Sequence, residues 1–263
     1  MIRIRRTRIR HALFVTLMLL IVALTMHRWI WRHGTPPPLS DLFPSGEIVI
    51  GVDASFAPFA SVDASGALVG LDIDLGRALG ARMGLPVRFV NMGYDGLYDS
   101  LESGQVDVLI SALVIDPLRT ADVYYSWAYF NAGLVLVSER SFESMRDLPG
   151  RSLAYEYGST ADSEARLWLR RVEPFATRPY ETPQHALDAV RLGQADAALV
   201  DATAARLYLR AHPQWSADYA QVTASLYSAA VRIDRTWIWR LVNRELLALL
   251  NDGTIDALLA RWL

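Results

Sequence analysis

Two oppositely charged residues, Arg119 and Asp201, each follow one copy of a short repeated pattern. The copies are GQVDVLI at 104–110 and GQADAALV at 193–200. A guanidinium donates a fork of hydrogen bonds to a carboxylate, and a carboxylate accepts hydrogen bonds from an ammonium group. One such charge on each side of a cleft could hold the α-carboxylate and the α-ammonium of a single small molecule.

The repeat itself predicts a helix that ends and a buried strand that begins. Gly104 and Gly193 stand where the residue after a helix adopts a positive φ, and the apolar runs that follow are typical of strands covered on both faces. We therefore expect two similar α/β lobes. The alternative is a helix-glycine-strand corner that any α/β protein can repeat.

Composition indicates a folded protein and excludes several classes of function. The chain has 263 residues, 52% of them hydrophobic, and no cysteine, which excludes disulfides, thiolate catalysis and cysteine-ligated zinc. All 26 basic residues are arginine and the net charge is −2. Beyond the N-terminus these arginines form no basic stripe, so we expect no nucleic-acid partner.

The N-terminus, residues 1–31, has the pattern of an export signal. Five arginines, at positions 3, 5, 6, 8 and 10, precede an uncharged apolar run from 12 to 26. The run fits a cleaved signal peptide or, extended through Trp31, an uncleaved anchor to the inner membrane over residues 12–31, which we favour. Either way the remainder would be periplasmic or otherwise extracytoplasmic. A proline-rich linker follows over 32–46.

The hydrophobic pattern and the helix start and stop signals of the folded part predict alternating strands and helices. Expected strands cover 47–52, 87–90, 133–138, 152–155, 173–180, 219–222 and 228–232, besides the two in the repeat. Expected helices begin at Asp72, Asp95, Ser159 or Thr160, Pro183, Thr203, Thr236 and Thr254.

Sequence templates for common enzymes are missing. The chain has no G-x-S-x-G, H-E-x-x-H, Walker or G-x-G-x-x-G motif, and His185 and His212 are expected on the surface. No group of carboxylates has the spacing of a metal site or an acid/base pair. We therefore expect no metal, no cofactor and binding without reaction.

Several segments together resemble one family, the extracytoplasmic family 3 solute-binding proteins of polar amino-acid uptake systems. They are GVDASFAPF at 51–59, GALVGLDIDL at 66–75, LESGQVD at 101–107, Arg119, YGST at 157–160 and DGT at 252–254. The resemblance implies an α/β, two-lobed periplasmic-binding-protein-like fold of type II. Lobe 1 would comprise 47–133 plus 223–263, lobe 2 would comprise 134–222, and two hinge strands would join them.

The resemblance also assigns binding residues. Arg119 looks like the family's carboxylate-binding arginine and Asp201 like its ammonium-binding carboxylate. Ser159 and Thr160 lie in a loop whose backbone amides would add donors for the ligand carboxylate. Alternatively, Arg119 pairs with a neighbouring aspartate, Asp116 or Asp122, and the other three residues only cap helices.

Further positions line the expected pocket. Phe56 and Tyr94 correspond to apolar or aromatic walls, although either could be core, and Ser111 corresponds to a contact near the ligand ammonium. Ala112 and Val114 stand where close relatives often carry serines, which removes polar contacts.

Two carboxylates indicate what the ligand's side chain could be. Glu156 falls where an apolar side chain often lines the pocket, and Asp53 falls where some members contact the distal end of the ligand. Together they favour a basic amino acid such as arginine, lysine or ornithine, because an unpaired buried charge is costly. The alternative is that Glu156 points to solvent.

The expected function is therefore binding of a polar amino acid by a monomer whose lobes close on it, for delivery to the membrane subunits of an ABC permease. Two alternatives stay open. One is a membrane-tethered amino-acid sensor. The other is a cyclohexadienyl or arogenate dehydratase on the same fold, with Glu156 or Glu173 as the acid.

Overall fold

A computed structural model describes residues 18, 20–25, 34 and 36–263 and divides the chain into two compact units, Met1–Leu42 and Phe43–Leu263. In the first unit, residues 20–25 are helical. None of the described helices has the length and apolar character needed to cross a membrane. The anchor expected over 12–31 lies largely outside the described residues.

The segment expected to be a proline-rich linker, 32–46, contains one helical turn, α2 (Leu39–Leu42). Directly after it, Phe43 is only 1% exposed and belongs to the core of the second unit. Compact structure thus begins a few residues before the position expected from the sequence.

The first lobe is built on a five-stranded sheet of order β5-β1-β6-β13-β7. Its strands are β1 (Ile48–Val52), β5 (Val87–Asn91), β6 (Val108–Leu109), β7 (Val123–Asn131) and β13 (Leu226–Arg232). β1 runs parallel to β5 and β6, whereas β13 is antiparallel to β6 and β7. A small antiparallel sheet adds β2 (Ser55–Phe56), β3 (Ala60–Val62) and β4 (Leu68–Val69).

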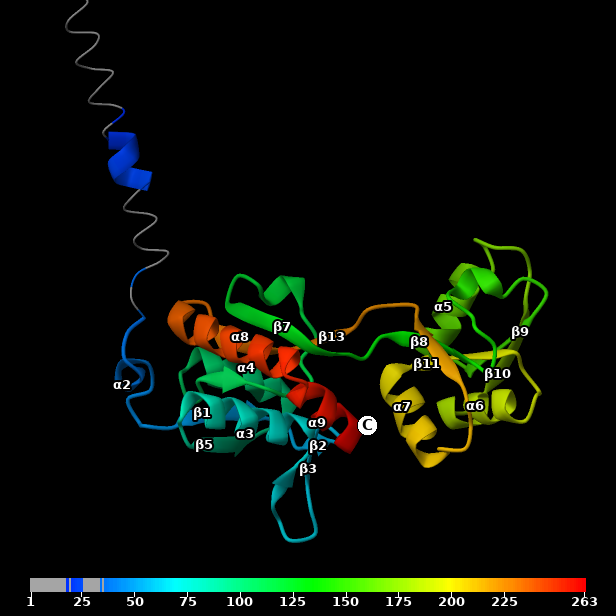
Figure 1. Ribbon diagram of the computed structural model, residues 1–263, viewed down its shortest axis with the longest axis horizontal. Helices are drawn as coiled ribbons and strands as arrows, with labels where there is room; N and C mark the ends of the chain where they lie inside the picture. The colour runs from blue at the N-terminus through cyan, green and yellow to red at the C-terminus, as the bar shows by residue number, and fades with distance from the viewer. Residues whose placement is uncertain (1–17, 19, 26–33, 35) are drawn as a thin grey trace, which may run out of the picture. The chain divides into compact units, whose positions relative to one another are not determined.

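Helices α3 (Leu71–Met83) and α4 (Tyr94–Glu102) connect the parallel strands of this sheet. The last two helices, α8 (Thr236–Asn251) and α9 (Thr254–Trp262), return to the same lobe and pack against α3 and each other (Figure 1). Their starts agree with the sequence prediction.

The second lobe has its own five-stranded sheet, of order β10-β9-β11-β8-β12. The strands are β8 (Leu134–Ser138), β9 (Ser152–Glu156), β10 (Ala176–Tyr180), β11 (Ala197–Asp201) and β12 (Asp218–Gln221), and the helices are α5 (Thr160–Trp168), α6 (Pro183–Arg191) and α7 (Ala202–Ala211). Leu153 and Tyr155 of β9 pack with Ala161 and Ala165 of α5 in one buried cluster. The two-lobed α/β fold expected from the sequence is therefore present.

The repeated pattern occupies equivalent places in the two lobes. Gly104 has φ 75° after α4, and Gly193 has φ 68° after α6, as a residue that ends a helix requires. The aspartates of the pattern act alike: Asp107 accepts from the Val49 N–H at 2.9 Å, and Asp196 accepts from the Ser152 N–H at 2.9 Å. Each carboxylate thereby fixes the start of the strand beside it.

The chain passes between the sheets twice, from β7 to β8 and from β12 to β13. The two passages touch, because the Ala132 N–H donates to the Ser225 carbonyl at 2.8 Å and the Ser225 N–H donates to Asn131 Oδ1 at 2.9 Å. Strand β7 is not among the strands expected from the sequence, and its pairing with β13 shifts register twice. These shifts break the alternation by which a strand is recognised.

Candidate functional site

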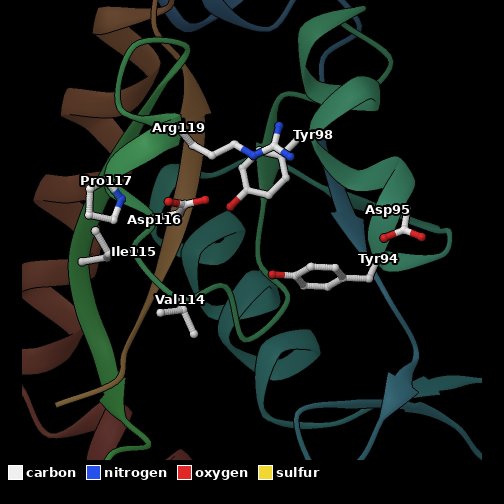
Figure 2. Close-up of a pocket in the computed structure, with 8 residues that line it drawn as sticks. All are labelled: Tyr94, Asp95, Tyr98, Val114, Ile115, Asp116, Pro117 and Arg119. Atoms are coloured by element: carbon white, nitrogen blue, oxygen red, sulfur yellow. The ribbon is translucent and has the colours of Figure 1, made fainter. Parts of the chain in front are cut away.

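The first lobe contains a cavity of about 440 Å³ at the start of α4, shown in Figure 2. Its walls come from α4 and from the segment that leaves β6. The lining residues are Tyr94, Asp95, Tyr98, Val114, Ile115, Asp116, Pro117 and Arg119. Two residues expected at the site, Tyr94 and Arg119, thus lie at one cavity. Tyr94 is 50% exposed, so its alternative assignment to the core is wrong.

Arg119 ends a short 3₁₀ helix, η1 (Pro117–Arg119). The sequence forms this turn because Asp116 Oδ1 accepts from the Leu118 N–H at 2.9 Å and Pro117 supplies a φ suited to the first helical position. The turn carries the Arg119 side chain to the cavity.

Arg119 forms no ion pair with any carboxylate in the part of the chain that the structure describes. The alternative pairing with Asp116 or Asp122 is therefore wrong. Instead, its guanidinium carbon lies 4.3 Å from the centre of the Tyr98 ring (Figure 2). A cation in this position keeps its N–H donors available to an anion.

Tyr98 is not among the residues expected at the site from the sequence. It follows Tyr94 by four residues and so lies on the same face of α4, where both rings line the cavity. That spacing was the available signal.

Asp53 and Ser111 meet where two neighbouring parallel strands end. The Asp53 N–H donates to Ser111 Oγ at 2.9 Å, and Asp53 Oδ1 accepts from the Ser55 N–H at 3.0 Å. Asn91, at the end of β5, accepts from the Ala54 N–H at 2.9 Å. In α/β sheets, ligands commonly bind beyond such carboxyl ends of strands; the reading of the sequence did not include Asn91.

A buried carboxylate supports the residue after Ser111. Ala112 has a φ of 47°, which is uncommon for a residue other than glycine, and its N–H donates to Asp72 Oδ2 at 2.7 Å. The Tyr129 hydroxyl donates to Asp72 Oδ1 at 2.8 Å. Burial raises the pKa of Asp72 to about 7, although the hydrogen bonds from Tyr129 and Ala112 act in the opposite direction. The sequence presented Asp72 only as the start of a helix.

Phe56 is 49% exposed, so its alternative assignment to the core is wrong. Its ring stacks on Phe59, with centroids 5.5 Å apart. Phe59 in turn packs edge-on against Tyr227 of β13, at 5.2 Å. An aromatic wall therefore extends from the small sheet to a strand that connects the lobes.

In the second lobe, Glu156, Ser159 and Thr160 lie together at the end of β9 and the start of α5. Ser159 Oγ accepts from the Ala161 and Asp162 N–H groups at 3.1 and 3.3 Å and donates to the Glu156 carbonyl at 2.7 Å. Ser159 is therefore the helix N-cap, as its alternative assignment held, and Thr160 is the first helical residue. Capping and ligand binding can coexist at such a turn.

Asp201 ends β11 and is the N-cap of α7, since Oδ1 accepts from the Ala204 N–H at 2.8 Å. The pKa of Tyr227 is raised, first by burial and then by the negative charge of Asp201. Asp201 therefore lies within electrostatic range of the aromatic wall. Within the described residues no ion pair joins Asp201 to Arg119, so their action on one ligand stays a prediction.

This chain is similar to known solute-binding proteins. Residues 48–263 match the family described as bacterial extracellular solute-binding proteins, family 3. ABC transporter arginine-binding protein 1 of Escherichia coli strain K12 is 29% identical over 223 residues, which cover 82% of this chain and 90% of the relative.

Two further proteins show the same likeness. The lysine/arginine/ornithine-binding periplasmic protein of Escherichia coli strain K12 is 28% identical over 226 residues, covering 81% of this chain and 86% of the relative. The solved structure of an ancestral cationic amino acid solute binding protein has a TM-score of 0.62 and 28% identity, and the match covers 85% of this chain and 98% of that one.

Proposed function

Because the chain belongs to the bacterial extracellular solute-binding proteins of family 3, we propose that it binds an amino acid and delivers it to the membrane subunits of an ABC uptake permease. The observation that carries the proposal is Arg119, an exposed guanidinium without a carboxylate partner in the described part of the chain, beside a cavity of about 440 Å³. Such a group suits the two oxygens of an α-carboxylate.

The α-ammonium of the ligand would be held from the second lobe by Asp201. Its Oδ1 already accepts one hydrogen bond from the start of α7, and a carboxylate has further lone pairs for an ammonium. Ser159 and Thr160 would place the first amides of α5 toward the ligand carboxylate.

We propose a basic amino acid, such as arginine, as the ligand. Asp95 and Asp116 line the same cavity as Arg119, so acidic groups outnumber basic ones there. Asp53 and Glu156 would add negative charge at the distal end of the ligand. The support from relatives is that two of them are named for arginine or for lysine, arginine and ornithine.

Capture would require the lobes, 47–133 with 223–263 and 134–222, to close around the ligand by bending at the two passages between the sheets. The permease would then recognise the closed form. This scheme places the folded part outside the cytoplasm, with residues 12–31 as the segment that directs or anchors it.

Isothermal titration of the purified full chain with each standard amino acid and ornithine tests the proposal. We expect arginine, lysine or ornithine to bind more tightly than glutamine or glutamate, and a saturating ligand to raise the thermal midpoint by mass action. Tighter binding of glutamine or glutamate would contradict a basic ligand. If no amino acid binds or shifts the midpoint, the receptor function itself fails.

We propose binding without turnover. Glu173, one of the two acids considered for a dehydratase, is exposed and lies before β10. Under this proposal, incubation with prephenate or arogenate is expected to yield no phenylpyruvate or phenylalanine. Formation of either product would make the protein an enzyme.

A further inference from the structure

The guanidinium of Arg119 rests on an aromatic ring although a carboxylate is close by in the chain. Arg119 Cζ lies 4.3 Å from the centre of the Tyr98 ring. Asp116, three residues earlier, lines the same cavity but forms no ion pair with it. Figure 2 shows the guanidinium across the ring, with the Asp116 carboxylate apart from it.

The Tyr98 ring is itself fixed from a second element. Its hydroxyl lies 2.9 Å from the hydroxyl of Tyr125 on β7, so the ring is held by both the backbone of α4 and a strand of the sheet. Burial and the hydrogen bond with Tyr125 raise the pKa of Tyr98, which keeps the phenol neutral. A neutral ring with an anchored hydroxyl is a rigid support.

The nature of this support matters for binding an anion. A guanidinium paired with Asp116 would have its charge compensated and its N–H donors occupied, and a ligand carboxylate would have to displace that partner. A ring attracts the cation through its π-electrons and uses none of those donors.

We propose that Tyr98 is a positioning residue for the ligand carboxylate. Its ring, anchored by Tyr125, holds Arg119 at the cavity and away from Asp116. The inference rests on the proposed function, since it assigns a role within the same site.

The test compares two probes that differ only in the α-carboxylate, L-arginine and its decarboxylated analogue agmatine, by titration calorimetry on the full chain. Removing the ring with Tyr98→Leu should weaken arginine binding by about 2- to 30-fold, the range of a cation–π contact, and weaken agmatine binding by a smaller factor. Tyr98→Phe keeps the ring, so its affinity for arginine should fall less than that of Tyr98→Leu. Tyr125→Phe removes the hydroxyl that anchors the ring but keeps the ring itself, so its affinity for arginine should also fall less than that of Tyr98→Leu.

A shape-matched pair keeps the test independent of folding. Phenylalanine and pentafluorophenylalanine at position 98 have similar shapes, but fluorination removes the negative face of the ring. We expect the ratio of arginine to agmatine affinity to fall with fluorination. An unchanged ratio, or an equal loss for both probes, would overturn the inference while leaving the proposed function intact.

If the wild-type protein bound no amino acid, the proposed function would fail separately. Whether the Tyr98 ring holds Arg119 away from Asp116 would then be decided by the crystal structure of Tyr98→Leu. Movement of the Arg119 guanidinium to Asp116 would support the role, and an unmoved guanidinium would refute it.

Discussion

The backbone N–H of Ala112 donates a 2.7 Å hydrogen bond to the carboxylate of Asp72, a side chain with no exposed surface. Ala112 has a positive φ of 47° and directly follows Ser111, whose hydroxyl accepts from Asp53. Strained backbone of this kind persists only where surrounding contacts fix it. Asp72 therefore stabilises the backbone conformation at the carboxyl end of β6, beside the proposed ligand.

Asp72 should make stability depend on pH. Burial raises its pKa from 3.8 to about 7 in the folded protein, so the folded state binds an extra proton between these values. The contribution of Asp72 to the free energy of unfolding is therefore fully present below about pH 4 and is lost as the pH rises through about 7, by on the order of 4 kcal/mol. Urea unfolding of wild type and Asp72→Asn from pH 4 to 8 should show this decline only in the wild type.

Asp63→Asn is the matched control for that experiment. Asp63 is exposed, and a hydrogen bond from Ser65 lowers its pKa, so its effect on stability lies below pH 4. Parallel curves for wild type and Asp72→Asn between pH 4 and 7 would show that Asp72 is not the group responsible.

Arg119→Gln should weaken amino-acid binding by about 30-fold or more, because a charged fork to the carboxylate is lost. Arg119→Lys keeps the charge but not the paired donors, and its affinity should lie between those of wild type and Arg119→Gln. Because the Arg119 side chain is exposed, the thermal midpoint without ligand should hardly change. If calorimetry showed that the Arg119→Gln variant binds with the affinity of wild type, Arg119 would not be a ligand-binding residue.

Asp201 can be tested for capping and binding separately. Asn is as good an N-cap as Asp, so Asp201→Asn should keep the hydrogen bond to the Ala204 N–H and lose only the charge. Asp201→Ala loses both and should also cost about 1 kcal/mol of stability. We expect weak ligand binding in both variants and lower stability in the Ala variant alone. Normal binding by Asp201→Asn would leave Asp201 with capping as its role.

The acidic distal end can be tested with citrulline, the uncharged isostere of arginine. Asp53→Asn and Glu156→Gln should each reduce the affinity for arginine and leave that for citrulline nearly unchanged, because only the charged ligand gains from a carboxylate. Calorimetric titrations of both ligands give the ratio. Wild-type protein that binds citrulline as tightly as arginine would refute a basic specificity.

The sequence alone determined the features that depend on neighbouring residues. Local backbone preferences and short spacings predict the helix-ending glycines at 104 and 193 and the helix starts at Pro183, Thr236 and Thr254. These were sufficient to predict the α/β class and the two lobes, whereas the binding role of Arg119 stays a prediction.

Only the tertiary structure decided which distant groups meet. Asp72 and Ala112 are 40 residues apart, and Tyr98 and Tyr125 are 27 apart. Arg119 has two aspartates within three residues, yet it lies over a ring from another element. Local pattern cannot rank these partners, because the choice depends on how α4, β6 and β7 pack, which places a phenol rather than a carboxylate under the guanidinium.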